Sequence, residues 1–286
     1  MLPESHIFGK LIRLFRCRVF CVFTYYTDES YDSKTFCVGG WLYHDDLWKV
    51  VEKKWSDRIE YERRRSIKRG ETPISRFHAA DCSNRRGEFD GWPVDRQKLF
   101  FKKLVGIICS SAPTAVAWAS SFEDLRSFFP NYKQKTAQRV LYYLCFQKCL
   151  RDVLSIMREN YPSERVAVIH DDGFNGTAQA AFNLVRRKFD QNRVIVTVAP
   201  MRWQDCTLLQ PADMIAYEGS KVCFRYRNNI PQMRRSFQKI LGAKLGLSVG
   251  YVNQTTFEQA KYPKSQTPED GRMESYDANE KDEAAQ

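Results

Sequence analysis

The stretch FTYYTDESYDSKTFCVGGW, residues 23–41, is the part of the sequence that most directly indicates the fold. Two runs rich in aromatic and β-branched residues, at 18–27 and 35–43, flank a short polar segment. Such residues favour strands, and the short connection predicts a β-hairpin. The first run ends in two adjacent acids, Asp28 and Glu29. Carboxylates are rarely buried without a partner, so this pair is a candidate for chemistry as well as for an ordinary turn.

The rest of the chain alternates helical and extended patterns. Asp45 and Asp46 are typical helix caps, and apolar residues at helical spacing follow them up to residue 59. The segments FHAADC (77–82) and GEFDGWP (87–93) are predicted to form loops. Further strands are predicted at 114–122, 166–170 and 194–198, and further helices at 96–110, 133–160, 177–190, 207–226 and 232–243.

The order of these elements predicts a single α/β domain over residues 18–260. Three strands before the first crossover favour an antiparallel meander, and the later alternation favours parallel pairing through right-handed crossovers. We therefore expect a mixed five-stranded sheet with flanking helices and a helical insertion, about 45–112, between the second and third strands. An N-terminal extension, 1–17, precedes the domain. The polar, charged residues 261–286 have the composition of a disordered acidic tail.

The net charge of +11 is unevenly distributed along the 286 residues. Residues 265–286 contain seven acidic and two basic side chains, a net charge of −5, which leaves +16 for the rest of the chain. A basic body suits a polyanionic partner such as nucleic acid, although excess charge can also serve solubility alone. The cluster YERRRSIKRG, residues 61–70, is either a phosphate-contacting segment or a solvated face.

The cysteines and the hydropathy pattern indicate a cytoplasmic protein. Nine cysteines occur, without a CxxC pair, and most lie in apolar runs, as small buried thiols do in a reducing compartment. Charged residues interrupt the N-terminal region, which argues against a signal peptide. No apolar run approaches the roughly 18 residues of a membrane span. No Walker, GxSxG, HExxH or GxGxxG motif is present.

A second pair of acids, Asp171 and Asp172, follows the apolar run VAVIH. Ligands in open α/β sheets collect beyond the carboxyl ends of the strands, so the two acid pairs are neighbours if their strands pair. Because side chains alternate along a strand, we expect only one of Asp28 and Glu29 to be a ligand and the other to support or cap it. Helix capping is the alternative role for the second pair.

Polar residues in two other segments are further candidates. Asp213 lies early in the helical segment LLQPADMIAYE (208–218), with Gln210 close to the same helix face. A first-turn acid is also favoured by the helix dipole alone. His78 and Asp81 in FHAADC are candidate ligands of a substrate or metal, or ordinary hydrogen-bonded loop residues. Several carboxylates that converge at a sheet edge suit Mg²⁺ or Mn²⁺, which prefer oxygen ligands.

Five motifs in order resemble the domain of unknown function 3800 family over roughly residues 20–225. They are TDES (27–30), VGGWL (38–42), FHAADC (77–82), VAVIHDD (166–172) and LLQPADMIAYE (208–218). That family is similar to the ribonuclease H-like superfamily, in which acids of the first strand, the fourth strand and the last helix bind two divalent ions.

The resemblance implies which residues of this chain bind metal. Asp28, Asp171 and Asp213 occupy the three positions. A further acid is expected early in the first helix after the meander, but this helix begins KQKTAQRV (133–140) and has none. Glu29, Asp172 or Asp81 are the candidates to replace it.

The leading prediction is a nuclease that cleaves RNA or DNA with two Mg²⁺ or Mn²⁺ ions. Its catalytic residues are expected to be Asp28, Glu29, Asp171 and Asp213, with Asp172 as a further metal ligand. Candidate substrate contacts are His78, Asp81, Gln210, Arg63, Arg64 and Arg65. The alternatives are a catalytically inactive nucleic-acid-binding module, or a component of a defence or toxin system that binds a protein partner.

Overall fold

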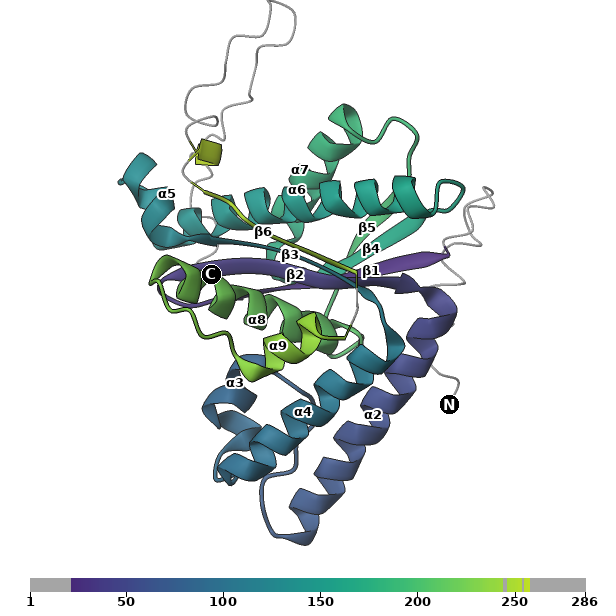
Figure 1. Ribbon diagram of the computed structural model, residues 1–286, viewed down its shortest axis with the longest axis vertical. Helices are drawn as coiled ribbons and strands as arrows, with labels where there is room; N and C mark the ends of the chain where they lie inside the picture. Colours follow the sequence, from purple (N-terminus) through teal and green to yellow (C-terminus); the bar gives the residue numbers. More distant parts are fainter. Residues whose placement is uncertain (1–21, 244–245, 254, 258–286) are drawn as a thin grey trace, which may run out of the picture.

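A computed structural model describes residues 22–243, 246–253 and 255–257 (Figure 1). Within these residues a mixed sheet lies between two layers of helices. The strands are arranged in the order β5-β4-β1-β2-β3-β6. Their bounds are β1 (Phe23–Tyr31), β2 (Thr35–His44), β3 (Thr114–Ser121), β4 (Val166–Asp171), β5 (Ile195–Met201) and β6 (Leu247–Tyr251). The predicted N-terminal extension and acidic tail lie outside the described residues.

Strand pairing confirms the hairpin and the mixed α/β sheet. The pairs β1–β2 and β2–β3 are antiparallel, whereas β1–β4, β4–β5 and β3–β6 are parallel. The prediction of five strands was wrong, because the described chain forms a sixth, β6, beside β3. This edge strand has only five residues, LSVGY, including a glycine, and its local pattern is too short to reveal it.

Most predicted helices are present within one or two residues of their expected ends. The helices are α2 (Asp45–Lys68), α3 (Ala79–Asn84), α4 (Val94–Ser111), α5 (Phe122–Phe128), α6 (Gln134–Asn160), α7 (Asn175–Lys188), α8 (Leu209–Arg227) and α9 (Arg235–Leu241). Two short 3₁₀ turns, η1 (Gly87–Phe89) and η2 (Asp172–Phe174), complete the described elements. The segment FHAADC, predicted as a loop, instead begins α3.

Helix α5 was also not predicted. It follows β3 directly, and the Ser121 hydroxyl accepts hydrogen bonds from the backbone N–H groups of Glu123 and Asp124. This N-cap satisfies donors that the first helical turn leaves without partners. The capping serine belongs to the predicted strand, which hid the helix start.

The two faces of the sheet bury separate apolar cores. In Figure 1, α6 and α7 lie above the sheet, and α8, α9 and the inserted helices α2–α4 lie below it. Along β2, Phe36 and Val38 belong to the upper core, and Cys37 and Trp41 to the lower core. This alternation follows the two-residue period of a strand and explains why β2 is apolar on both faces.

Glycines allow α8 to approach the centre of the sheet. A Cβ atom at Gly39 would lie 2.9 Å from both the Cα and the backbone N of Ala216. A Cβ atom at Gly219 would lie 2.7 Å from the Sγ of Cys37. The indole N–H of Trp41 donates to the Pro211 carbonyl at 2.8 Å and sets the position of α8 along its axis. Asp213 is therefore held directly over β1 and β2.

The insertion between β2 and β3 has its own polar anchor. Arg96 of α4 is buried, and its Nε donates to Glu62 of α2 at 3.0 Å while its Nη2 donates to Ser66 at 2.9 Å. Its guanidinium also stacks on Trp92 and pairs with Glu71. A buried arginine is tolerated when its donors are used in this way. The network fixes the loop that leads to α3.

The cysteines of the described residues are all free. No helix among these residues has the length and apolar character that crossing a membrane requires.

Candidate metal centre

The centre forms where β1 continues beyond the end of β4. The parallel pairing runs from Phe23 opposite Val166 to Thr27 opposite His170. Strand β4 then ends at Asp171, whereas β1 continues to Tyr31. Asp28 and Glu29 therefore lie inside the strand, not at its end as predicted. Over this stretch β1 is paired with β2 alone within the described chain, so one edge of β1 is open.

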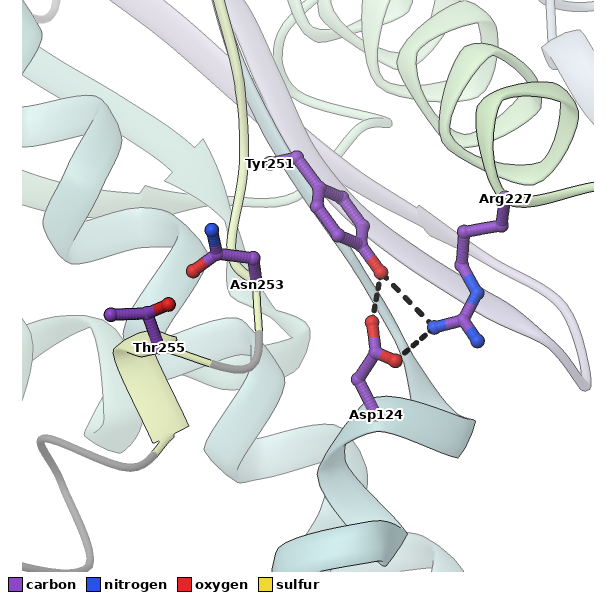
Figure 2. A pocket seen from close by; sticks show the side chains of 5 residues that line it. All are labelled: Asp124, Arg227, Tyr251, Asn253 and Thr255. Carbon is purple, nitrogen blue, oxygen red and sulfur yellow. Dashed lines mark hydrogen bonds and ion pairs between the residues drawn. The ribbon is translucent and has the colours of Figure 1, made fainter. Parts of the chain in front are cut away.

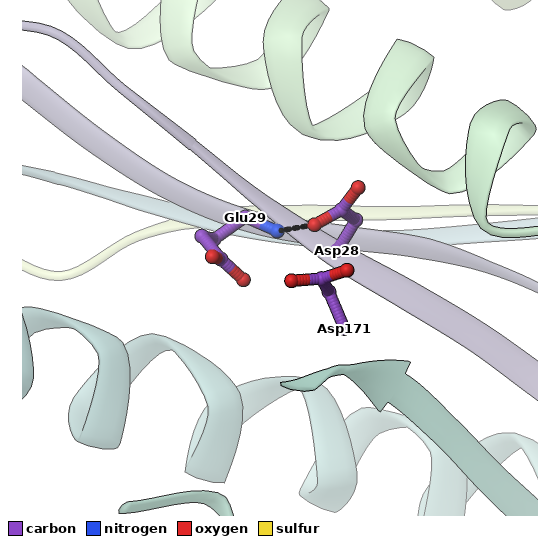
Figure 3. A group of neighbouring side chains, drawn as sticks. All are labelled: Asp28, Glu29 and Asp171. Atoms are coloured by element: carbon purple, nitrogen blue, oxygen red, sulfur yellow. Dashed lines mark hydrogen bonds between the residues drawn. The ribbon is translucent and has the colours of Figure 1, made fainter. Parts of the chain in front are cut away.

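Asp28 and Glu29 leave opposite faces of β1. Asp28 pairs with Gly39, which faces α8, and Glu29 pairs with Val38, which belongs to the core under α6. Nevertheless one oxygen of each, together with one oxygen of Asp171, lies within 4.8 Å of the others (Figure 3). The open edge of β1 lets side chains from both faces turn towards the end of β4. Both acids therefore approach the end of β4, and the expectation that only one of them is a ligand stays a prediction.

Two of the three carboxylates accept backbone hydrogen bonds. The Glu29 N–H donates to Asp28 Oδ1 at 2.8 Å, and the Gly173 N–H donates to Asp171 Oδ2 at 3.2 Å. In contrast, Glu29 Oε2 is buried and has no hydrogen-bond partner among the described residues. A buried carboxylate oxygen without a donor is costly, and a cation can satisfy it. The all-oxygen triad can therefore hold a metal ion.

The three acids resist ionisation in the absence of a cation. Burial, followed by the charges of Glu29, Asp213 and Asp171, raises the pKa of Asp28 well above its ordinary value. Burial and the charge of Asp171 raise the pKa of Glu29 to about 8. Burial also raises the pKa of Asp171, and its hydrogen bond from Gly173 opposes this effect. A bound cation favours the ionised forms and removes the conflict.

Asp213 lies beside this triad. Its charge raises the pKa of both Asp28 and Glu29, so α8 contributes to the field of the centre. Its carboxylate is not part of the group of oxygens within 4.8 Å found in the described chain. Instead, Asp213 Oδ2 accepts the Ala79 N–H at 2.7 Å. Asp213, the predicted third ligand, thus lies next to the triad of Asp28, Glu29 and Asp171 but is not part of it.

Asp172 and His170 frame Asp171. Asp172 is exposed in η2, and its charge raises the pKa of Glu29 and Asp171. The His170 ring is buried, and its Nδ1 lies 2.6 Å from the Asp171 carbonyl oxygen. Burial lowers the pKa of His170, which favours a neutral ring. His170 therefore supports the end of β4.

The candidate residues of FHAADC lie on the α8 side of the centre. His78 Nδ1 is 2.7 Å from Asp81 Oδ2, and the two side chains are 37% and 41% exposed. The charge of His78 lowers the pKa of Asp213. Gln210 has a supporting contact, because its Oε1 accepts the Trp55 indole N–H at 3.0 Å and the Phe77 backbone N–H at 2.8 Å.

The arginines of α2 are not brought to the centre. Arg63 and Arg64 pair with Glu60 of the same helix at 3.4 and 2.7 Å, and Arg65 lies 3.7 Å from Glu62. Helix α2 begins beside the sheet and runs away from it (Figure 1). These side chains form a charged face on the distal part of the insertion.

Sequence reasoning missed one cation near the acids, Arg76. Its guanidinium carbon lies 3.6 Å from the ring centre of Trp203. Its charge lowers the pKa of both Asp171 and Asp213. The available signal was its place directly before FHAADC, but nothing local connects it to Trp203, which is far away in the sequence.

A separate polar cavity of about 310 Å³ lies beyond the ends of β3 and β6 (Figure 2). Arg227 pairs there with Asp124 and with Glu123, and its Nη1 donates to the Tyr251 hydroxyl at 3.2 Å. The Tyr251 hydroxyl also donates to Asp124. These groups satisfy one another, which suits a structural link between α8, α5 and β6.

No protein-family model matches this chain, and no curated protein matches it significantly. The resemblance to the domain of unknown function 3800 family therefore stays a prediction.

Proposed function

We propose that this protein is a divalent-metal-dependent nuclease of the ribonuclease H-like type, acting on RNA or DNA. The observation that carries this proposal is the triad of Asp28, Glu29 and Asp171, whose oxygens lie within 4.8 Å of one another. The buried, unpartnered Glu29 Oε2 distinguishes this triad from an ordinary group of surface acids. Hard oxygen donors alone favour Mg²⁺ or Mn²⁺ over softer metals.

The roles of the residues follow from their positions. The cation would be held by Asp28 and Glu29 on β1 and by Asp171 on β4. Asp213 on α8 adds negative charge that acts on Asp28. When bound, divalent ions activate the attacking water and stabilise the charge of the phosphoryl transition state. The backbone bonds from Glu29 and Gly173 keep two of the carboxylates oriented before a cation arrives.

The order of the elements supports the ribonuclease H-like assignment. The antiparallel strands β1–β3 come first, β4 and β5 follow after α6 and α7, and α8 comes last with Asp213. One departure concerns α6, which has no acid in its first turn. Glu29 supplies a carboxylate from β1 instead. The basic body of the chain suits a nucleic-acid substrate.

A nuclease assay tests the proposal. The protein is incubated with labelled single-stranded, duplex and hybrid substrates, with and without Mg²⁺ or Mn²⁺. Asp28→Asn and Asp171→Asn are expected to lower the rate by about a hundredfold or more, since metal stabilisation of the transition state amounts to several kcal/mol. The exposed Asp57 of α2 provides a matched control, and Asp57→Asn should keep the rate. An inactive wild-type protein, or an active Asp28→Asn variant, contradicts the proposal.

A second candidate function is a module that binds nucleic acid, or a protein partner, without cleavage. The hydrogen bond from Ala79 favours it, because this bond occupies one oxygen of Asp213. Salt-sensitive binding to nucleic acid that needs no metal, in the absence of any cleavage, would support this function over the first.

A further inference from the structure

A segment of the insertion, residues 75–79, is hydrogen-bonded to α8 beside the candidate metal centre. Its backbone N–H groups are held by three side chains from other elements. Ser75 donates to Glu88 at 2.7 Å, Phe77 to Gln210 at 2.8 Å, and Ala79 to Asp213 at 2.7 Å. Two of these acceptors lie on α8, the helix that also faces β1. These hydrogen bonds fix the backbone of the segment relative to Asp213 on α8.

Arg76 lies in the middle of this segment. Its guanidinium carbon is 3.6 Å from the ring centre of Trp203, in the connection between β5 and α8. Both residues are half-buried. Stacking on an indole is a favourable position for a guanidinium, and it leaves the N–H groups at the edge of the plane free for an acceptor. The stack therefore orients the guanidinium of Arg76 and leaves its N–H groups available as hydrogen-bond donors.

The guanidinium of Arg76 has no carboxylate partner among the described residues, whether in an ion pair or a hydrogen bond. The neighbouring Arg202 differs, because its Nη2 lies 2.6 Å from Asp205. The charge of Arg76 nevertheless lowers the pKa of Asp171 and Asp213, so it acts on two acids of the site. A cation that served only to neutralise these acids would be expected to pair with one of them.

We propose that Arg76, positioned by Trp203, binds a non-bridging oxygen of the phosphodiester on which the metal centre acts. The inference rests on the proposed nuclease function and assigns its phosphate-binding residue. An arginine fork matches two phosphate oxygens and gives shorter, stronger hydrogen bonds than a neutral donor. Arg76 lies three residues before Ala79, whose N–H donates to Asp213 at 2.7 Å, so its charge lies where a phosphate would otherwise meet only carboxylates and their cations.

Two measurements on the full-length protein test this assignment. Fluorescence anisotropy gives the affinity for short labelled single-stranded DNA and RNA in Ca²⁺, at several salt concentrations. Calorimetry with Mn²⁺ alone gives the affinity of the metal site. Arg76→Ala is expected to weaken oligonucleotide binding by about tenfold or more and to lower the salt slope by about one. Its Mn²⁺ affinity should be equal to or tighter than that of the wild type, because a nearby positive charge is removed.

Arg202→Ala is the matched control, because this arginine lies beside Trp203 but is paired with Asp205. It should change oligonucleotide binding by less than about twofold. Arg76→Lys keeps the charge but loses the planar fork, so its affinity should lie between those of the wild type and Arg76→Ala.

The positioning role of Trp203 requires a double-mutant cycle. Trp203→Leu should weaken oligonucleotide binding, and adding it to Arg76→Ala should cause no further loss, because the indole acts through the guanidinium. Losses that multiply in the double variant would overturn this role. Circular dichroism confirms that each variant is folded.

The possible failures can be distinguished. If Mn²⁺ and oligonucleotide both bind, and Arg76→Ala and Arg76→Lys bind oligonucleotide like the wild type, the assignment of Arg76 is wrong while the nuclease proposal stands. If the wild type binds Mn²⁺ but no oligonucleotide, the phosphodiester assignment is wrong. If the wild type binds neither, the proposed function fails and the assignment of Arg76 fails with it.

Discussion

Glu29 combines two electrostatic problems within the candidate metal centre. Its Oε2 is buried without a partner, and burial together with the charge of Asp171 raises its pKa to about 8. The folded chain therefore keeps a proton on this carboxyl at neutral pH, whereas the unfolded chain has lost it. A divalent cation bound by the triad would displace that proton and use the same oxygen.

The affinity for Mn²⁺ should rise with pH up to about 8. Protons and metal compete for the oxygens of Asp28, Glu29 and Asp171, whose pKa values are all raised. Each proton displaced changes the affinity by up to about tenfold per pH unit. Calorimetry in buffers with different ionisation enthalpies measures both the affinity and the protons released. A constant affinity from about pH 6 to about pH 8 would contradict this linkage.

Without metal, Glu29→Gln should flatten the pH dependence of stability. The pKa of Glu29 in the folded chain lies above its value of 4.5 in the unfolded chain. The native state therefore binds more protons than the unfolded state between pH 4.5 and about pH 8. Wild-type stability therefore falls as the pH rises through this range, and the neutral amide removes the part of that fall that Glu29 contributes. Urea unfolding at several pH values measures it, with the exposed Glu159→Gln as control. Parallel curves for wild type and Glu29→Gln would refute the prediction.

Helix α8 connects the sheet, the inserted helices and the centre. It lies against β2 through Gly39 and carries both Gln210 and Asp213, which hold the segment before α3. Its depth on the sheet therefore decides how close Asp213 comes to Asp28. Gly39 of VGGWL is needed for this contact, since any larger side chain would push α8 outwards.

Gly39→Ala should destabilise the fold and impair the site. The new Cβ would meet the Ala216 backbone at 2.9 Å, and backbone cannot move away as a flexible side chain does. We expect a loss of about 1–3 kcal/mol in the free energy of unfolding and weaker nuclease activity. Gly176→Ala on α7 is the control, because no atom lies near its Cβ position, and it should be neutral or stabilising by up to about 1 kcal/mol. Equal stability of Gly39→Ala and wild type, measured by urea unfolding, would show that α8 does not need this close contact.

The fold brings four distant parts of the chain together near the end of β4, inside the sheet. The hairpin supplies Asp28 and Glu29, the crossover strand β4 supplies Asp171, and α8 with the insertion supplies Asp213 and Arg76. These groups meet only in the folded state. A ligand of the centre therefore stabilises the entire domain and binds the unfolded chain weakly.

Mn²⁺ should raise the melting temperature of the wild-type protein. At a metal concentration of about 100 times Kd, the stabilisation amounts to about 2.7 kcal/mol. Asp171→Asn should lose most of this shift, because it removes a charged ligand atom of the triad. Asp57→Asn should keep it. Differential scanning fluorimetry measures the shift in melting temperature. A similar shift in the wild type, Asp171→Asn and Asp57→Asn would indicate unspecific metal binding.

Local patterns were sufficient for most elements, and they singled out the acids as candidates. Long helices such as α6 and apolar strands such as β2 have clear periods, and Asp28, Glu29, Asp171 and Asp213 were all predicted as site residues. Short elements were not predicted, because α5 and β6 have too few residues to show a hydrophobic period. The loop prediction for FHAADC failed as well, since a six-residue helix gains its stability from contacts with other elements.

The sequence by itself determined the mixed sheet, the hairpin that begins it and the presence of carboxylates on β1, β4 and α8. Those properties depend on residue type and on spacing along the chain. Only the tertiary structure decided which carboxylates meet. Strand alternation separates Asp28 from Glu29, but β4 ends before β1 does, and the open edge brings both towards Asp171. The stacking of Arg76 on Trp203 likewise depends on two distant loops, because contact across space is set by packing rather than by local pattern.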